Sequence, residues 1–419
     1  MVRSVQGDSV PHGWKYDYLD NFTVRGSGHT PNKEKPEYWN GGVKWVSLSD
    51  SFNLDKGLIS ETDKEISDEG IKNSSAVIHP AGTVILSRDA GVGKSAVLAS
   101  KMAVSQHFMA WRCDNSSKMN SWFLYNWLQV MKPEFERQAV GSTIKTIGLP
   151  YFKKLKIAVP PYSEQSSIAK ILSVWDQAIS TNEKILEFNR LHKASLIQQL
   201  LTGKYRFPEF KKKWQNFLLS DMYLFKRGKN LSKDDLSTEG QKCILYGELY
   251  TKYDEVISVI HSKTKSEAGL ISKAGDILIP ASTTTSGMDL ANATAIMEDN
   301  VLLGGDINVL RQKHELCAPF MAHLLTHIKK NDITSRAQGI TIIHLYGKDL
   351  QTINVFIPTD IEEQNKIAAA LATADLEIKN SQAKISCLKQ EKKALMQQLL
   401  TGKRRVKVDA VEACANEQH

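Results

Sequence analysis

Residues 90–95, AGVGKS, follow a short apolar run and resemble a phosphate-binding loop. That motif has a further glycine five residues before the glycine of its Gly-Lys pair, because the loop must wrap its backbone amides around a phosphate. Arg88 stands at that position here, and no later apolar strand ends in an aspartate suited to hold magnesium. Nucleotide binding is therefore disfavoured, and Lys94 better fits a contact with a DNA phosphate or a solvated loop position.

Residues 159–162, VPPY, resemble the Asn/Asp-Pro-Pro-Tyr motif of amino-methyltransferases. In that motif the first side chain accepts hydrogen bonds from the amino group that is methylated, and Val159 cannot do so. A glycine-rich methyl-donor site of the FxGxG type is also missing from the sequence. The two prolines are better explained as the end of a strand, with Ser163 starting a helix.

His323 and His327 have the i, i+4 spacing of a metal-binding pair on a helix. No HExxH motif accompanies them, and core or surface positions on an amphipathic helix explain them better. Nothing in the sequence resembles a nucleophile with its base and orienting acid. We therefore expect no catalytic residue, no metal site and no cofactor in this chain.

The charge balance favours a polyanionic partner. The 419 residues include 54 lysines and arginines against 46 acidic residues, a net charge of +8, and the isoelectric point is about 9.0. Such a balance is most often found in proteins that bind nucleic acid. The length predicts two to three domains, and an apolar content of 42% predicts a folded core.

The cysteines and the apolar runs bear on the cellular compartment in which the protein is expected. The five cysteines are scattered and form no CxxC pair, which favours a reducing compartment. The sequence has no apolar run of about 18 residues to span a membrane. The first residues, MVRSVQGDSVPHGW, lack the apolar centre of a signal peptide. We expect a cytoplasmic protein without a membrane partner.

The heptapeptide QQLLTGK occurs twice, at residues 198–204 and 397–403. At this offset of 199 residues, 16 of the 41 positions from 164 to 204 are identical to their counterparts. Chance identity for ordinary composition is about one in sixteen. The repeat is too long for a solenoid and predicts a protein built as two halves.

Each copy of the heptapeptide ends a predicted long helix. Residues 163–201 contain no glycine or proline, which at 1.5 Å per residue predicts a helix of about 58 Å. The second helix should span 361–400, with Asp360 and Glu363 forming a capping box. Both carry apolar residues at heptad spacing, and neither can bury that seam alone. We expect them to pair as an antiparallel coiled coil if the halves obey pseudo-twofold symmetry.

A mixed segment precedes each helix. The first should contain a hairpin at 37–50, a strand at 84–86, a helix at 121–131 that Pro133 stops, and a strand at 155–159. The second segment repeats this pattern. The predicted class is α+β, with two mixed α/β globular domains separated by the two long helices. The expected boundaries are 1–160, 161–204, 205–357, 358–403 and a flexible tail at 404–419.

The doubled E-Q-x-x-I-A motif followed by QQLLTGK, together with PEYWNGGVKW at 36–45, resembles the specificity subunit of type I restriction–modification systems. The resemblance covers essentially the whole chain. It implies two target recognition domains that each read half of a split site in double-stranded DNA, and spacer helices that dock two methyltransferase subunits. It also implies that adenine methylation and ATP-driven translocation and cleavage, with the methyl donor, ATP and magnesium, belong to partner methyltransferase and restriction subunits.

Candidate DNA contacts are polar and basic residues on predicted loops, because hydrogen-bonding side chains read base edges in the major groove. In the first domain they are Ser27, His29, Thr30, Arg88, Lys94, Ser142, Thr143 and Lys145. In the second they are Arg227, Lys229, Asn230, Thr283, Thr284, Arg336, Gln338 and Thr341. The arginines and lysines are better suited to phosphates than to bases.

Two other classes of protein remain open at this point. One is a self-contained enzyme, such as a fused restriction–modification protein or a nucleotide hydrolase, whose activity in the purified chain would be lost on Lys94→Ala. The other is an assembly scaffold whose helices bind partners while its globular domains read no sequence. The second class predicts that no split motif is enriched from random duplexes.

Overall fold

The computed structural model describes residues 10–114 and 117–406 of the chain. The chain divides into two compact units. Unit 1 comprises residues 1–182 together with 384–419, and unit 2 comprises residues 183–383. Within the described ranges, no helix is both long enough and apolar enough to cross a membrane.

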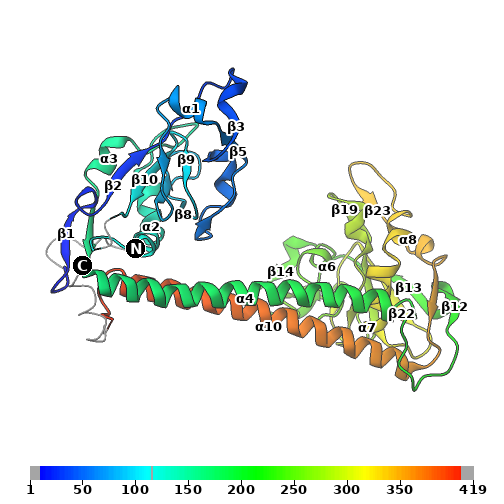
Figure 1. Ribbon diagram of the computed structural model, residues 1–419. Coiled ribbons are helices and arrows are strands. Elements are labelled where there is room, and N and C mark those ends of the chain that lie inside the picture. Colours follow the sequence, from blue (N-terminus) through cyan, green and yellow to red (C-terminus); the bar gives the residue numbers. More distant parts are fainter. Residues whose placement is uncertain (1–9, 115–116, 407–419) are drawn as a thin grey trace. The chain divides into compact units, whose positions relative to one another are not determined.

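The globular part of unit 1 is a mixed α/β domain. Its elements are, in chain order, β1 (Lys15–Tyr18), η2 (Leu19–Asn21), β2 (Val24–Ser27), η3 (Pro36–Tyr38), β3 (Trp39–Val46), η4 (Leu48–Phe52), β4 (Leu58–Ile59), β5 (Lys64–Ile66), α1 (Asp68–Lys72), β6 (Ile78–His79), β7 (Val84–Ser87), β8 (Ser95–Leu98), β9 (Met102–Val104), β10 (Phe108–Arg112), α2 (Ser121–Gln138), α3 (Leu149–Lys153) and β11 (Lys156–Val159). A five-stranded sheet has the order β2-β10-β7-β8-β4, a four-stranded sheet has the order β5-β3-β9-β6, and β1 pairs with β11. Helix α2 packs on β7 and β8 (Figure 1).

The central strands of unit 1 are buried on both faces because successive side chains of a strand point to opposite sides. Val84 and Leu86 of β7 pack in one core cluster with Phe123 of α2. Ile85, between them, packs in a second cluster that includes Val104 of the four-stranded sheet. The larger sheet therefore lies between α2 and the smaller sheet.

Unit 2 repeats this plan with its own globular part. Its elements are β12 (Gln215–Leu218), α5 (Leu219–Met222), β13 (Tyr223–Arg227), η5 (Lys233–Asp235), β14 (Leu236–Ser237), β15 (Gln241–Ile244), α6 (Glu248–Thr251), β16 (Ser262–Thr264), β17 (Leu270–Ile271), β18 (Asp276–Pro280), β19 (Ser282–Thr283), η6 (Gly287–Ala291), β20 (Thr294–Ile296), β21 (Leu302–Leu303), β22 (Ile307–Gln312), α7 (Ala318–His323), the π-helical turn η7 (Leu324–Ile328), α8 (Lys330–Thr334), β23 (Ile343–His344), α9 (Gly347–Leu350) and β24 (Asn354–Ile357). The sheets have the orders β13-β22-β18-β20 and β14-β16-β15-β21-β17, with β12 paired to β24 and β19 to β23. Here too Ile277 and Leu278 of β18 point into different core clusters.

Two helices of 39 residues, α4 (Tyr162–Leu200) and α10 (Ile361–Leu399), each contribute to both units. Their bounds confirm the two long helices expected from the sequence. Gly203 follows α4 and Gly402 follows α10, and both have a φ of 69°. Glycine adopts this left-handed conformation readily, and such a residue commonly ends a helix.

The two helices touch each other within each unit through equivalent ion pairs. In unit 1, Lys392 of α10 lies 2.5 Å from Asp176 of α4. In unit 2, Lys193 of α4 lies 2.6 Å from Asp375 of α10. The repeat offset of 199 residues relates Asp176 to Asp375 and Lys193 to Lys392. The same two repeat positions thus make the interhelical contact in both units.

In unit 2, a buried glutamate near the start of α10 binds an arginine and a tryptophan that follow α4. The carboxylate of Glu363 accepts hydrogen bonds from Nε and a terminal nitrogen of Arg206, both at 2.7 Å, and from the indole of Trp214 at 3.2 Å. The predicted capping box is therefore wrong: Asp360 does accept from the amide of Glu362, but the Glu363 side chain is held by Arg206 instead of returning to the helix start.

Unit 1 contains the equivalent arrangement. Glu164 accepts from Nε of Arg405 at 2.7 Å and from the indole of Trp14 at 3.3 Å. We call these two groups the glutamate clasps. Arg405 belongs to the segment that the sequence predicted to be a flexible tail, whereas residues 407–419 of that tail lie outside the described residues.

The glutamine of each repeated Glu-Gln pair has its own role. Gln165 accepts a hydrogen bond from the amide of Asn120, at the start of α2. Gln364 accepts one from the amide of Cys317, at the start of α7. Each long helix thus fixes the first turn of a domain helix, which explains why the Glu-Gln pair occurs in both repeats.

Two local predictions were wrong. Residues 39–46 form one strand, because Trp39 and Val43 both face Ile66 and the two glycines between them make a bulge instead of a turn. Helix α2 continues through Pro133 to Gln138. Met131 and Phe135 are buried on either side of the proline, and this packing compensates for the hydrogen bond that proline removes.

Candidate nucleic-acid interface

Each unit exposes a short loop of the same shape. Residues 140–146, tip loop 1, are closed by hydrogen bonds of 3.1 and 2.9 Å between the backbones of Val140 and Thr146. Residues 338–344, tip loop 2, are closed in the same way by bonds of 2.9 and 2.7 Å between Gln338 and His344. The two loops are related by an offset of 198 residues.

The shape of both tip loops requires glycine. Gly141 has a φ of 134°, and a Cβ placed on it would lie 2.3 Å from the carbonyl oxygen of Ile144. Gly339 has a φ of 127°, and its Cβ would lie 2.1 Å from the carbonyl oxygen of Ile342. Only glycine fits such a conformation without displacing the backbone.

In unit 1, neighbouring loops surround tip loop 1. The carbonyl of Arg88 accepts from the amide of Ile147 at 3.0 Å, and the amide of Arg88 donates to the carbonyl of His107 at 2.9 Å. The hydroxyl of Thr30 hydrogen-bonds to Gln106, next to His107. The structure therefore joins the segments at 30, 88, 107 and 141–145 into one surface at one end of the central sheet.

The predicted residues of unit 1 differ in how they meet solvent on this surface. Ser27, His29, Ser142, Thr143 and Lys145 are exposed. Lys94 is partly buried and donates from Nζ to the carbonyl of Ser51 at 3.2 Å. A hollow of about 420 Å³ brings Lys94, Thr143 and Lys145 together.

Residues 90–95 do not form the start of a nucleotide site. They connect β7 to β8, so Ser95 begins a strand, whereas a phosphate-binding loop leads into a helix. Val159 ends β11, as the sequence predicted for the two prolines, and α4 begins at Tyr162, one residue before the expected Ser163.

In unit 2, the corresponding segments meet around tip loop 2. Ser282 pairs with His344 in the short β19–β23 sheet. The carbonyl of Ala281 accepts from the amide of Leu345 at 2.9 Å, and its amide donates to Asp306 at 2.7 Å. Ala281 and Asp306 thus occupy the places of Arg88 and His107 in unit 1.

The predicted residues of unit 2 divide into exposed and engaged groups. Exposed are Arg227, Lys229, Asn230, Thr284, Gln338 and Thr341. Thr283 is only 1% exposed and its hydroxyl is hydrogen-bonded to Thr285, so it does not present its side chain on this surface. Arg336 is partly buried and donates to Thr352 at 3.4 Å.

The basic candidate residues also differ in whether they form ion pairs. Within the part of the chain that the structure describes, Lys145 and Lys229 form no ion pair. Arg227 lies 2.6 Å from Asp306, and Nε of Arg88 lies 3.6 Å from a neighbouring aspartate. The two unpaired lysines are the freest to meet a phosphate.

Sequence reasoning missed two kinds of residue on these surfaces. His107 and Gln106 precede β10 without any motif to mark them. Ile340, within tip loop 2, is 99% exposed, although an apolar side chain does not indicate a DNA contact by its type. The signal that could have found it is the apolar character of residues 340–343 between two turns.

The chain thus contains two similar units, and each exposes an equivalent tip loop with adjoining polar and basic loops. A family model described as type I restriction modification DNA specificity domain matches residues 11–188 and again residues 211–390. The chain therefore belongs to this family. Its role is to supply DNA sequence specificity as a non-catalytic subunit of a restriction–modification complex, in which catalysis belongs to partner subunits.

Similar proteins cover nearly the whole chain. The MjaVIII specificity subunit of a type I restriction enzyme from Methanocaldococcus jannaschii is 24% identical over 428 residues, spanning 97% of this chain and 96% of the relative. The MjaIX specificity subunit from the same organism is 22% identical, with 95% of each chain covered.

Solved structures have the same fold. The S subunit of a type I restriction–modification system from M. genitalium aligns with a TM-score of 0.58 at 16% identity, covering 94% of this chain and 97% of that one. The HsdS subunit from Thermoanaerobacter tengcongensis aligns with a TM-score of 0.52 at 15% identity, covering 94% and 98%.

Replacing Gly141 by alanine should misplace tip loop 1 and weaken DNA binding about tenfold, since backbone strain of this kind costs about 1–3 kcal/mol. The measurement is a binding titration of the assembled complex with its DNA. Gly148→Ala is the matched control, because its Cβ would lie at an ordinary 3.5 Å from Pro150. Equal affinities for the two variants would show that tip loop 1 does not meet DNA.

Proposed function

We propose that each unit reads one half of a bipartite DNA site, with its tip loop and the adjoining loops entering the major groove. The observation that carries this proposal is the duplicated tip loop. Both copies have the same backbone closure and the same glycine, but their side chains differ: GSTIK at 141–145 against GITII at 339–343. A shared scaffold with different side chains is suited to two different half-sites.

The differing positions suggest what each loop reads. Ser142 and Lys145 of tip loop 1 can hydrogen-bond to bases or phosphates. Ile340 and Ile343 stand at the equivalent positions of tip loop 2. Ile343 packs against the core of unit 2, whereas the exposed Ile340 offers only apolar contact, as the methyl group of thymine requires. We infer that unit 2 reads a thymine where unit 1 reads a polar base edge.

Exchanging one side chain between the loops tests this assignment. Ile340→Ser should change the base preference at one or two positions of a single half-site, by about 1–3 kcal/mol per base pair, and leave the other half-site unchanged. Selection of bound sequences from a random duplex pool by the assembled complex measures both. A change in both half-sites, or in neither, would contradict the assignment of tip loop 2.

The long helices have the second role in this proposal. We infer that α4 and α10 pair along their length as an antiparallel coiled coil with pseudo-twofold symmetry. The equivalent ion pairs Asp176–Lys392 and Lys193–Asp375 support this, as do the two glutamate clasps. A rigid helix pair holds two readers at a fixed separation better than a flexible linker does.

We further propose that two methyltransferase subunits dock on the helices and that restriction subunits join this complex. The methyl donor, ATP and magnesium of their reactions then bind to those partners. The expected compartment is the cytoplasm, and the free cysteines Cys243 and Cys317 in the core agree with a reducing environment.

A further inference from the structure

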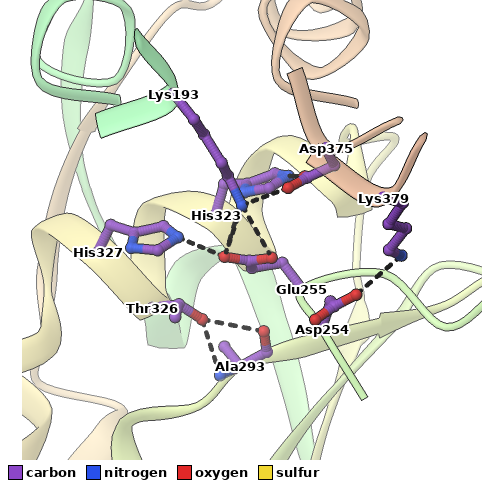
Figure 2. Close-up of polar contacts among 9 residues, drawn as sticks. All are labelled: Lys193, Asp254, Glu255, Ala293, His323, Thr326, His327, Asp375 and Lys379. Carbon is purple, nitrogen blue, oxygen red and sulfur yellow. Dashed lines mark hydrogen bonds and ion pairs between the residues drawn. The ribbon is translucent and has the colours of Figure 1, made fainter. Parts of the chain in front are cut away.

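Three potential metal ligands converge in unit 2, away from tip loop 2. They are Glu255, which follows α6, His323 at the end of α7, and His327 in the π-turn η7 (Figure 2). One ligand atom from each lies within 4.8 Å of the others. Nδ1 of His323 is 3.7 Å from Oε1 of Glu255, and Nε2 of His327 hydrogen-bonds to the same oxygen.

Backbone contacts hold these ligands in place. The carbonyl of Glu255 accepts from the amide of Ala295 in β20 at 2.8 Å. The hydroxyl of Thr326, between the two histidines, contacts both the amide and the carbonyl of Ala293 at 3.0 Å. The segments that carry the ligands are therefore attached to Ala295 of β20 and to Ala293, immediately before that strand, so little ordering is required when an ion binds.

The charge states suit a cation. Burial raises the pKa of the Glu255 carboxyl, but the hydrogen bond from His327 and the charge of Lys193 outweigh burial and hold this pKa well below its usual range. Burial lowers the pKa of His323 to about 4, so its ring is neutral at pH 7. His323 is 2% exposed, and its Nδ1 has no hydrogen-bond partner. An ionised carboxylate and a neutral imidazole are the forms that bind metals.

We propose that Glu255, His323 and His327 bind a zinc ion or a similar transition-metal ion, with water in the fourth position. Two histidines and a glutamate are an established ligand set for zinc, with ligands about 2.0–2.2 Å from the ion. A tetrahedral site of that size separates its ligand atoms by about 3.3 Å. The 3.7 Å between His323 and Glu255 needs only a small contraction.

The surroundings also resemble those of a metal site. Metal-bound histidines usually direct their other ring nitrogen towards a carboxylate. Nε2 of His323 faces Oδ2 of Asp375 at 4.0 Å. The ion replaces the hydrogen atom between Nε2 of His327 and Oε1 of Glu255. The neutral His327 ring then carries its proton on Nδ1.

Lys193 is the competing cation. Its Nζ lies 2.6 Å from Asp375 and 3.4 Å from Glu255. Bound metal repels this ammonium group from Glu255 and leaves it on Asp375. The ion would thus hold the loop at Glu255 and the π-turn together, next to Lys193 of α4 and Asp375 of α10.

The described part of unit 1 has no equivalent site. Its corresponding helix α2 contains no histidine among residues 121–138.

Calorimetric titration of the metal-free full-length protein with zinc chloride tests this site. We expect one zinc ion per chain, with affinity reduced at least about 100-fold by His327→Gln or Glu255→Gln, in line with the loss of a ligand. Lys193→Met should increase the affinity, because it removes the competing charge. His314→Gln, at an exposed position of the same unit, should change nothing.

Cobalt substitution provides a second measurement, since visible absorption from a tetrahedral cobalt site should appear in the parent protein and vanish in His327→Gln. Thermal melting of each variant shows that it is folded. The proposal is overturned if the folded parent binds no zinc below about 100 μM. It is also overturned if zinc binds equally well to His327→Gln and Glu255→Gln, or if Lys193→Met weakens binding.

Discussion

Arg206→Met is expected to lower the melting temperature of the protein by about 10 °C. The change leaves the carboxylate of Glu363, whose side chain is 1% exposed, buried without its charged partner. Removing one member of a buried ion pair costs about 3–5 kcal/mol, and each kcal/mol shifts a unit of this size by about 2–4 °C. Differential scanning calorimetry measures the shift.

A second substitution separates charge from packing. Arg206→Met combined with Glu363→Gln should recover about half of the loss, because a neutral amide oxygen still accepts from the indole of Trp214. Lys242→Met serves as the control, since Lys242 and Glu298 form an ion pair with both side chains 46% exposed, worth less than about 1 kcal/mol. A similar shift for Arg206→Met and Lys242→Met would mean that the glutamate clasp contributes no more than a surface pair.

Removing one heptad from each long helix should shorten the gap between the half-sites by about three base pairs. Residues 183–189 and 382–388 are equivalent in the repeat. Seven residues correspond to about 10.5 Å of helix, and DNA rises about 3.4 Å per base pair. Sequence selection by the assembled variant measures the gap, and both half-sites should keep their bases.

The length of the deletion provides the control. Seven residues turn the remaining helix by only about 20°, which preserves the apolar seam. Five residues turn it by about 140° and should destabilise the helix pair instead of producing a clean shorter gap. A heptad variant that folds and keeps the original gap would show that the helices do not set the spacing.

The sequence predicted the elements that depend on long patterns. The two helices followed from the absence of glycine and proline and from the repeat, and the strand Val84–Ser87 from its apolar run. Local signals were weaker where distant contacts decide the structure. The capping box failed because Glu363 meets Arg206, which lies 157 residues away. Helix α2 passes Pro133 because the core holds both sides of it.

For the candidate DNA-binding residues, too, the sequence predicted the location better than the exposure of each side chain. The sequence did place candidate DNA contacts on both tip loops: Ser142, Thr143 and Lys145 on the first, and Gln338 and Thr341 on the second. Residue type alone did not tell which side chains are free. Thr283 is buried although it lies in a run of polar residues, whereas Ile340 is exposed although it is apolar. Burial depends on the β19–β23 pairing, which no local pattern reveals.

The most direct test of two-unit reading is selection of bound sequences from random duplexes by the complex assembled with its methyltransferase subunits. Two-unit reading predicts two conserved half-sites of different sequence, separated by a constant number of unconserved base pairs. A single contiguous motif, or no enriched motif at all, would contradict it.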